Sequence, residues 1–240
     1  MLKLFEQINP TYCYLLFAFL LSVGIFSLIY YKKSKDSIFL FNGLISFGLC
    51  YDTIITGLGY HLVNVSGFYW IGIFRHVFHA LTPLIMMIVL NAFRDCGKLL
   101  HKNYTKLVWV LVFFLSGGAI VAIFTSPVDL IDYGGVIRHS IDKDNAFFLS
   151  RFILKFLSYG TLIPMSAGAI VTIRYKKDYN MLISTLGMLG FTLVGVIFDP
   201  KLIFLSSFLG EAILVFFYFR YAYQKFQDTN LGKDAPEELI

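Results

Sequence analysis

The chain contains 240 residues, of which 58% are hydrophobic and only 15% are charged. Soluble globular domains contain roughly 45–50% apolar residues, so this composition excludes an ordinary soluble domain and predicts an integral membrane protein. Three cysteines without a CxxC pair indicate neither a disulfide framework nor a zinc site, and the net charge of +5 is explained by basic loops on one side of a membrane, without a nucleic-acid partner.

Seven apolar stretches are each long enough to cross the hydrocarbon core as a helix, which takes roughly 17–25 residues. They occupy residues 13–31, 37–59, 68–93, 107–125, 148–173, 180–198 and 202–223. The connections between them are short. The predicted fold class is therefore all-α, with one bundle of seven transmembrane helices over residues 1–223 and a polar cytoplasmic tail over residues 224–240 that we expect to fray.

The first span is preceded by Asn9 and Pro10 and lacks a charged segment followed by a small-residue cleavage site, so it is predicted to be a retained helix. Lysine and arginine gather in the loops after the first, third and fifth spans and in the tail. The positive-inside rule then predicts an outside N-terminus and a cytoplasmic C-terminus, in a plasma or inner membrane.

Ionisable side chains interrupt four of the spans. Asp52 lies on the second, the segment RHVFH (Arg75 to His79) on the third, Lys155 on the fifth and Glu211 on the seventh. A charged group at mid-membrane costs roughly 2.5–3.5 kcal/mol, so each requires a partner or a function. At 1.5 Å of rise per residue, these groups lie roughly 10–16 Å below the outer boundary, which predicts one common polar layer.

Two features adjoin this layer. Pro83 cannot donate a hydrogen bond to the carbonyl of His79, which predicts a kink beside the histidines. The longest connection, residues 126–147, contains proline, paired glycines and four aspartates, and is predicted to be a turn-rich lid or cap on the outer side.

The polar layer combines two acids, fixed cations and two imidazoles, a set suited to proton transfer. RHVFH is predicted to form one wall of an outer-half pocket, opposite Asp52 and Glu211. The candidate catalytic residues are Asp52, Glu211, His76 and His79. The candidate substrate-binding residues are Arg75, Tyr51, Thr56, Lys155, Tyr159 and Ser207. The alternative is a salt-bridge network of Asp52 and Glu211 with Arg75 and Lys155 that only fixes the helix register.

Metal and cofactor sites are weakly indicated. His76 and His79 with the two acids could supply zinc ligands, but His-x-x-His alone is a weak signal, so we expect neither a metal nor a cofactor. The last span has no lysine for a retinal Schiff base and no histidine pair of the kind that seven-span zinc hydrolases carry there.

The layout of seven spans, with an acid on the second helix in LCYDTIITG and another on the last in SFLGEAIL, resembles the membrane-bound terpene cyclases of meroterpenoid biosynthesis. The resemblance implies that Asp52 and Glu211 form an acid pair that protonates an epoxide or alkene of an isoprenoid chain, with aromatic walls guiding the carbocation. The acid types are interchanged, and RHVFH is not part of the pattern.

The main hypothesis is therefore a membrane-embedded enzyme that uses acid–base chemistry on a lipid or isoprenoid substrate. The alternatives are a proton-coupled transporter in which Asp52, His79 and Glu211 exchange protons, a seven-helix sensor for a lipophilic ligand, and a structural protein. The expected partners are membrane lipids and a lipophilic small molecule, without nucleic acid, and a homo-oligomer is left open.

Overall fold

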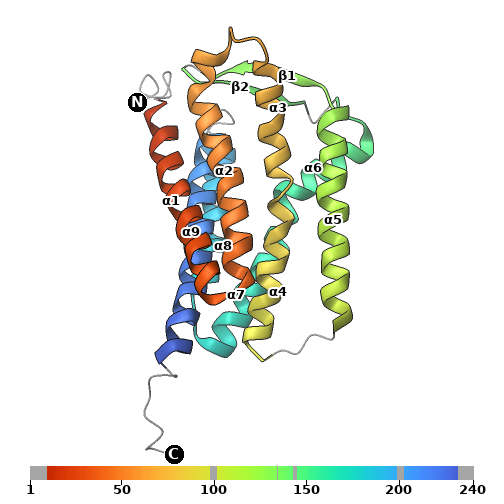
Figure 1. Cartoon of the computed structure of the whole chain (residues 1–240). Helices are drawn as coiled ribbons and strands as arrows, with labels where there is room; N and C mark the ends of the chain where they lie inside the picture. Colours follow the sequence, from red (N-terminus) through yellow and green to blue (C-terminus); the bar gives the residue numbers. More distant parts are fainter. Residues whose placement is uncertain (1–9, 98–101, 134, 143–144, 199–202, 232–240) are drawn as a thin grey trace, which may run out of the picture.

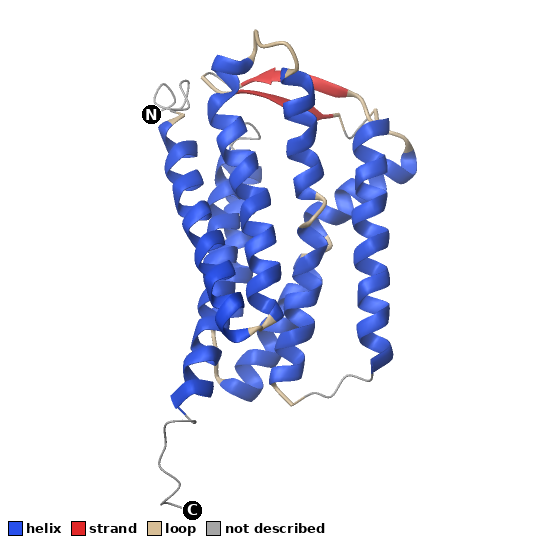
Figure 2. Cartoon of the chain, in the orientation of Figure 1, coloured by secondary structure: helices blue, strands red, loops and turns tan. Residues whose placement is uncertain are grey.

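The computed structural model describes residues 10–97, 102–133, 135–142, 145–198 and 203–231. These residues are mostly helical (Figure 2). The helices are α1 (Thr11–Ser34), α2 (Ser37–Leu62), α3 (Phe68–His79), the 3-10 helix η2 (Thr82–Leu84), α4 (Ile85–Asp95), α5 (Lys102–Thr125), α6 (Phe148–Tyr159), α7 (Leu162–Lys176), α8 (Asn180–Phe198) and α9 (Ile203–Leu231). The strands are β1 (Val128–Asp132) and β2 (Ile137–Ile141).

Six helical segments within the described residues are long and apolar enough to cross a membrane. They are α1, α2, α3 with α4, α5, α6 with α7, and α9, each taken over its apolar residues. The stretch predicted as the sixth span falls on α8, whose apolar part, residues 180–194, is shorter. Large apolar side chains such as Phe113 (71% exposed) and Ile163 (72%) point outward, as expected of a protein surrounded by lipid.

The predicted kink at Pro83 is confirmed as a break between α3 and α4. α3 ends at His79, and the chain passes through η2 before helical geometry resumes at Ile85. The hydroxyl of Thr82 donates a 2.5 Å hydrogen bond to the carbonyl of His79, the acceptor that Pro83 cannot satisfy. The hydroxyl of Thr82 therefore replaces the hydrogen bond that Pro83 removes, and this stabilises the break.

The fifth predicted span is also broken, and this break was not predicted. α6 ends at Tyr159 and α7 begins at Leu162. Pro164 follows four residues after Gly160, so it cannot supply the usual helical donor to the Gly160 carbonyl, and the amide of Ile163 makes a weaker 3.3 Å contact with it. Pro164 was the available signal for this break.

The bundle is arranged around α2. It packs against α1, α3, α4 and α9, while α8 packs along α9 and α6 along α5 (Figure 1). α1 begins at the end of the bundle that carries the hairpin, and α9 ends at the opposite end (Figure 1). Buried aromatic and aliphatic side chains of these helices, among them Phe39, Ile88 and Tyr218, form the main core.

The predicted outer cap contains an antiparallel β-hairpin, which departs from the all-α expectation. Val128 pairs with Ile141 and Asp132 with Ile137, and the hairpin lies across one end of the bundle (Figure 1). We call β1, β2 and their turn the cap. A Cβ atom on Gly59 of α2 would lie 1.7 Å from the carbonyl oxygen of Ile137, so the glycine lets the cap lie directly on the helix.

At the opposite end, α9 continues past the predicted boundary at residue 223. Its helix extends to Leu231, and Lys225 forms ion pairs with Asp36 (2.6 Å) and Asp95 (2.7 Å). The expectation that the tail frays is therefore wrong for residues 224–231, because Lys225 fixes them to the helices beside them. Residues 232–240 lie outside the described part.

Candidate functional site

A cavity of about 310 Å³ lies inside the bundle beneath the cap. Its ionisable lining comes from α2, α3, β2 and α9, and further lining side chains, threonines among them, come from the two breaks and from α6, α7 and α8. The polar and ionisable side chains that line it are Asp52, Arg75, His76, His79, Thr82, Arg138, Ser140, Thr161, Thr192, Ser207 and Glu211.

Asp52 is the most strongly held group of the site. It is 1% exposed, and its Oδ1 atom accepts hydrogen bonds from Arg75 Nη1 at 2.8 Å and from the hydroxyl of Thr56 at 3.2 Å. Its other oxygen, Oδ2, bonds Nε2 of His79. Both carboxylate oxygens are thus occupied, and the buried Arg75 compensates the charge of the carboxylate.

Arg75 also connects the site to the cap. Its Nη2 atom donates to the carbonyl of His139 on β2 and lies 2.9 Å from Nε2 of His76. Because a guanidinium group only donates, Nε2 of His76 accepts this bond and carries no proton there. Gly72, one turn before His76, makes room for the His139 ring, so α3 and β2 approach closely.

Arg138 is a functional candidate that was not among the predicted site residues. It lies on β2, lines the cavity, and its guanidinium carbon is 5.9 Å from the centre of the Phe208 ring. Burial, and then the charge of Arg75, lowers the pKa of Arg138 to about 10, so it remains a cation at neutral pH. The loop was predicted to be a cap, but nothing in the sequence showed which of its side chains turned inward.

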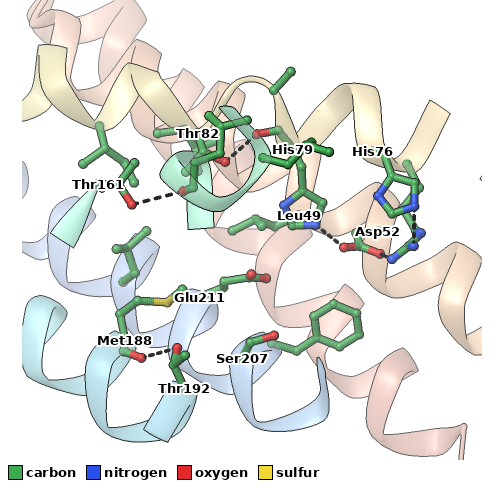
Figure 3. Close-up of a pocket in the computed structure, with 18 of the residues that line it drawn as sticks. Leu49, Asp52, His76, His79, Thr82, Thr161, Met188, Thr192, Ser207 and Glu211 are labelled. Atoms are coloured by element: carbon green, nitrogen blue, oxygen red, sulfur yellow. Dashed lines mark hydrogen bonds and ion pairs between the residues drawn. The ribbon is translucent and has the colours of Figure 1, made fainter. Parts of the chain in front are cut away.

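Glu211 lies on the wall formed by α9. Its Oε2 atom is buried and has no hydrogen-bond partner among the described residues, and no ion pair to Glu211 is found there. Figure 3 shows its carboxyl group in the space between Ser207 and the linked pair of Asp52 and His79. The two acids of the site therefore have different environments, one paired and one not.

The cavity changes character along the bundle axis. Arg138, Asp52 and Arg75 lie toward the cap, where α2 ends and α3 begins. Ile85 lies ten residues after Arg75, and Leu214 three after Glu211, toward the middle of the bundle. The cavity is thus polar beneath the cap and mainly apolar further in, where Met165 and Met188 also line it.

The structure brings most of the predicted site together. Asp52, Arg75, His76, His79, Ser207 and Glu211 line one cavity, and Thr56 supports Asp52 from behind. The arrangement differs from the prediction in one respect. Asp52 is bonded directly to the RHVFH segment on the same side of the cavity, and only Glu211 faces that segment from the opposite wall (Figure 3).

Three other predicted residues lie elsewhere or are not described. The hydroxyl of Tyr51 donates to the carbonyl of Ile71 at 3.2 Å, and Tyr51 does not line the cavity. Lys155 is exposed on α6 and is also outside the lining. The side chain of Tyr159 falls outside the described part of the chain. The threonines at the two breaks, Thr82 and Thr161, were not predicted to line the site.

Within the described residues, no three side chains of histidine, cysteine, aspartate or glutamate gather closely enough to hold a metal ion. Comparison of the chain with protein-family models and with curated proteins finds no match. The resemblance to terpene cyclases accordingly stays a prediction. What the fold and the cavity define is a helical, multi-pass membrane protein with a partly polar internal cavity.

Proposed function

We propose that the protein is a membrane-embedded enzyme that uses acid–base chemistry on a lipid or isoprenoid substrate. The observation that carries the proposal is the unequal pair of acids on opposite walls of one cavity: Asp52 is ion-paired, and Glu211 has no ion pair within the described part of the chain. Acids whose environments differ in this way take opposite roles in proton transfer. The orientation that goes with the proposal has the cap outside the cell, with α8 as a seventh crossing.

The environments of Asp52 and Glu211 assign their roles in the proposed reaction. A buried carboxyl group without an ion-pair partner costs less to bury as the neutral acid, so Glu211 is the proton donor to an epoxide oxygen or an alkene carbon. Asp52, held ionised by Arg75, orients and stabilises His79, which accepts a proton from the substrate carbon skeleton. One proton enters the substrate and one leaves it, so the net reaction is an isomerising cyclisation.

The apolar part of the cavity suits this chemistry. Ile85, Met188, Leu214 and their neighbours exclude water and surround an apolar chain, and Phe208 adds an aromatic ring to the lining. A volume of about 310 Å³ is at the lower end of the range of roughly 300–1,000 Å³ for small-molecule sites.

The test is untargeted mass spectrometry of membrane lipids and isoprenoids from cells that express the wild type, Asp52→Asn or Glu211→Gln at matched levels. Asp129→Asn, which changes an exposed acid of β1 outside the cavity lining, is the control. We expect a species that is formed or consumed with the wild type and the control, and not with the two site variants. Identical profiles in all four strains would refute an enzyme acting on the host's own lipids.

One observation favours a second candidate, a proton-coupled transporter. Both broken segments, α3 with α4 and α6 with α7, place residues of the break in the cavity, namely Thr82 and Thr161. Discontinuous helices around a central site are typical of secondary transporters. Reconstitution into vesicles distinguishes the two candidates, since a transporter moves an unaltered solute in response to a pH gradient, whereas an enzyme changes the molecule without one.

A further inference from the structure

A second pocket, of about 390 Å³, lies at the end of the bundle opposite the cap, between the α7–α8 turn and the last part of α9 (Figure 1). It shares no described lining residue with the cavity beneath the cap. Three basic side chains line it, Lys176, Lys177 and Arg220, together with two acids, Asp178 and Asp228. We call it the basic pocket. Its lining carries a net charge of +1.

The turn between α7 and α8 is held in place by its own hydrogen bonds and by a contact with α9. Lys177 adopts the left-handed conformation (φ 53°), which ends α7 and turns the chain. The side chain of Asp178 accepts a 2.7 Å hydrogen bond from the amide of Asn180, where α8 begins. Asn180, which is 5% exposed, donates from its side chain to that of Gln224 on α9. The two walls of the pocket are therefore fixed to each other.

The wall on α9 is formed by residues that are four apart. Arg220, Gln224 and Asp228 lie on one face of the helix because this spacing is close to one helical turn. Gln224 holds the α7–α8 turn, so Arg220 lies one turn before that contact and Asp228 one turn after it. Both charged groups thus face the turn that carries the two lysines.

The cations of the basic pocket are available to bind an anion. In the described part of the chain, no ion pair with Lys176, Lys177 or Arg220 is found. Lys225 on the same helix is different, because it pairs with two acids and does not line the pocket. Lysine and arginine that converge from two segments suit a phosphate group, and basic pockets at the membrane surface bind the head groups of anionic lipids.

An apolar stripe continues from the pocket along α8. Ile183 lines the pocket and is 41% exposed, and Leu186 (55%) and Leu193 (45%) follow on the same face of the helix. Tyr179, which also lines the pocket, is exposed, and tyrosine is enriched where a membrane meets water. The pocket therefore lies where a lipid has its head group, and the stripe lies where the lipid has its chains.

We propose that the basic pocket binds the head group of an anionic phospholipid from the leaflet on the side opposite the cap. Lys176, Lys177 and Arg220 hold the phosphate oxygens, and Asp228 accepts a hydrogen bond from a head-group hydroxyl. One acyl chain follows the exposed face of α8 from Ile183. The net charge of +1 on the lining matches a head group that carries one negative charge. This lipid site is separate from the proposed function and does not depend on it.

The experiment measures which lipid the protein retains. The full-length protein is placed in nanodiscs of equal parts phosphatidylglycerol and phosphatidylcholine, released, and analysed by native mass spectrometry. We expect the wild type to retain one phosphatidylglycerol, with a preference of about tenfold over phosphatidylcholine. Lys176→Gln combined with Arg220→Gln should abolish most of this preference, since each cation removed takes away charge-assisted hydrogen bonds to the phosphate.

A matched variant distinguishes the pocket from the general positive charge of this end of the bundle. Lys32→Gln combined with Lys33→Gln removes two exposed cations near the end of α1, outside the pocket lining, and should change nothing. Equal retention of the two lipids by the wild type, an equal loss in both double variants, or a preference that survives in the folded pocket variant would overturn the proposal. Thermal unfolding verifies that each variant is folded.

Inorganic phosphate distinguishes a lipid site from a site for a soluble ion. In micelles of an uncharged detergent, added phosphatidylglycerol should raise the melting temperature of the wild type and not that of the pocket variant. Inorganic phosphate at the same concentration should leave both unchanged. A rise with phosphate as large as the rise with phosphatidylglycerol, lost in the pocket variant, would identify a phosphate site and refute the lipid assignment.

Discussion

The two ends of the bundle each contain a cluster of charged side chains, and the clusters differ in what lies beside them. At the end opposite the cap, Lys225 bridges Asp36 and Asp95, and Tyr221 donates to Asp95 at 3.3 Å. These contacts join α9 to the start of α2 and the end of α4. None of these four residues lines the cavity. We call Lys225, Asp36 and Asp95 the staple.

The cluster beneath the cap uses similar groups for a different arrangement. Asp52 is bonded to both Arg75 and His79, but these residues border a cavity, and Glu211 faces them across it without an ion pair among the described residues. Proximity of acids and bases is therefore not what distinguishes the proposed site. The distinction is that Glu211 has no ion pair among the described residues and lies beside space for a ligand. Mutations in the two clusters should therefore differ in their effects on function and on stability.

The largest expected effect is that of Glu211→Gln on turnover. Loss of a general acid typically lowers the rate by 10²–10⁴-fold, so we expect at least a 100-fold fall in formation of the species identified by mass spectrometry. Stability should change little, because Glu211 forms no ion pair within the described residues. The measurement compares product level with the melting temperature. A 100-fold loss that merely follows a loss of folded protein would contradict the assignment.

Asp52→Asn should affect both function and stability. Removing one partner of a buried ion pair typically costs about 3–5 kcal/mol, since it leaves Arg75, which is 1% exposed, without its counter-charge. Thermal unfolding of purified protein measures the loss. Asp52→Asn combined with Arg75→Gln should lose less stability than the sum of the two single variants. Additive losses would show that the two side chains do not stabilise each other.

Much of the fold follows from the sequence for simple reasons. The positions of the helices follow from the length of each apolar stretch, and the break after His79 follows from Pro83. The common depth of Asp52, His79 and Glu211 follows from the rise of a helix, because depth depends only on the position along the chain.

The features that the sequence did not reveal depend on how helices rotate and on how a loop folds back. Depth places Lys155 with the other ionisable residues, but rotation of α6 exposes it outside the cavity lining. Rotation also decides that Asp52, and not Glu211, pairs with Arg75. Arg138 reaches the cavity only because β1 and β2 pair in register across the end of the bundle, and its loop shows no apolar pattern that predicts this.

Gly59→Ala tests how the cap is held in place, with a smaller effect. The added methyl group would lie 1.7 Å from the carbonyl oxygen of Ile137, so the hairpin must move, at a cost of about 1–3 kcal/mol. Hydrogen exchange of β1 and β2 should become faster. Gly117→Ala is the matched control, because its Cβ meets open space on α5. Equal exchange in both variants would mean that the cap does not rest on Gly59.

The smallest expected effect is that of Lys225→Met in the staple. Lys225 is 30% exposed, so its two ion pairs are partly screened by water and their loss should cost about 1 kcal/mol. We expect a slightly lower melting temperature and an unchanged lipid conversion, the reverse of the result for Glu211→Gln. If Lys225→Met abolished conversion while the protein stayed folded, the opposite end would be coupled to the cavity through α9, and the separation of the two clusters into a staple and a site would be wrong.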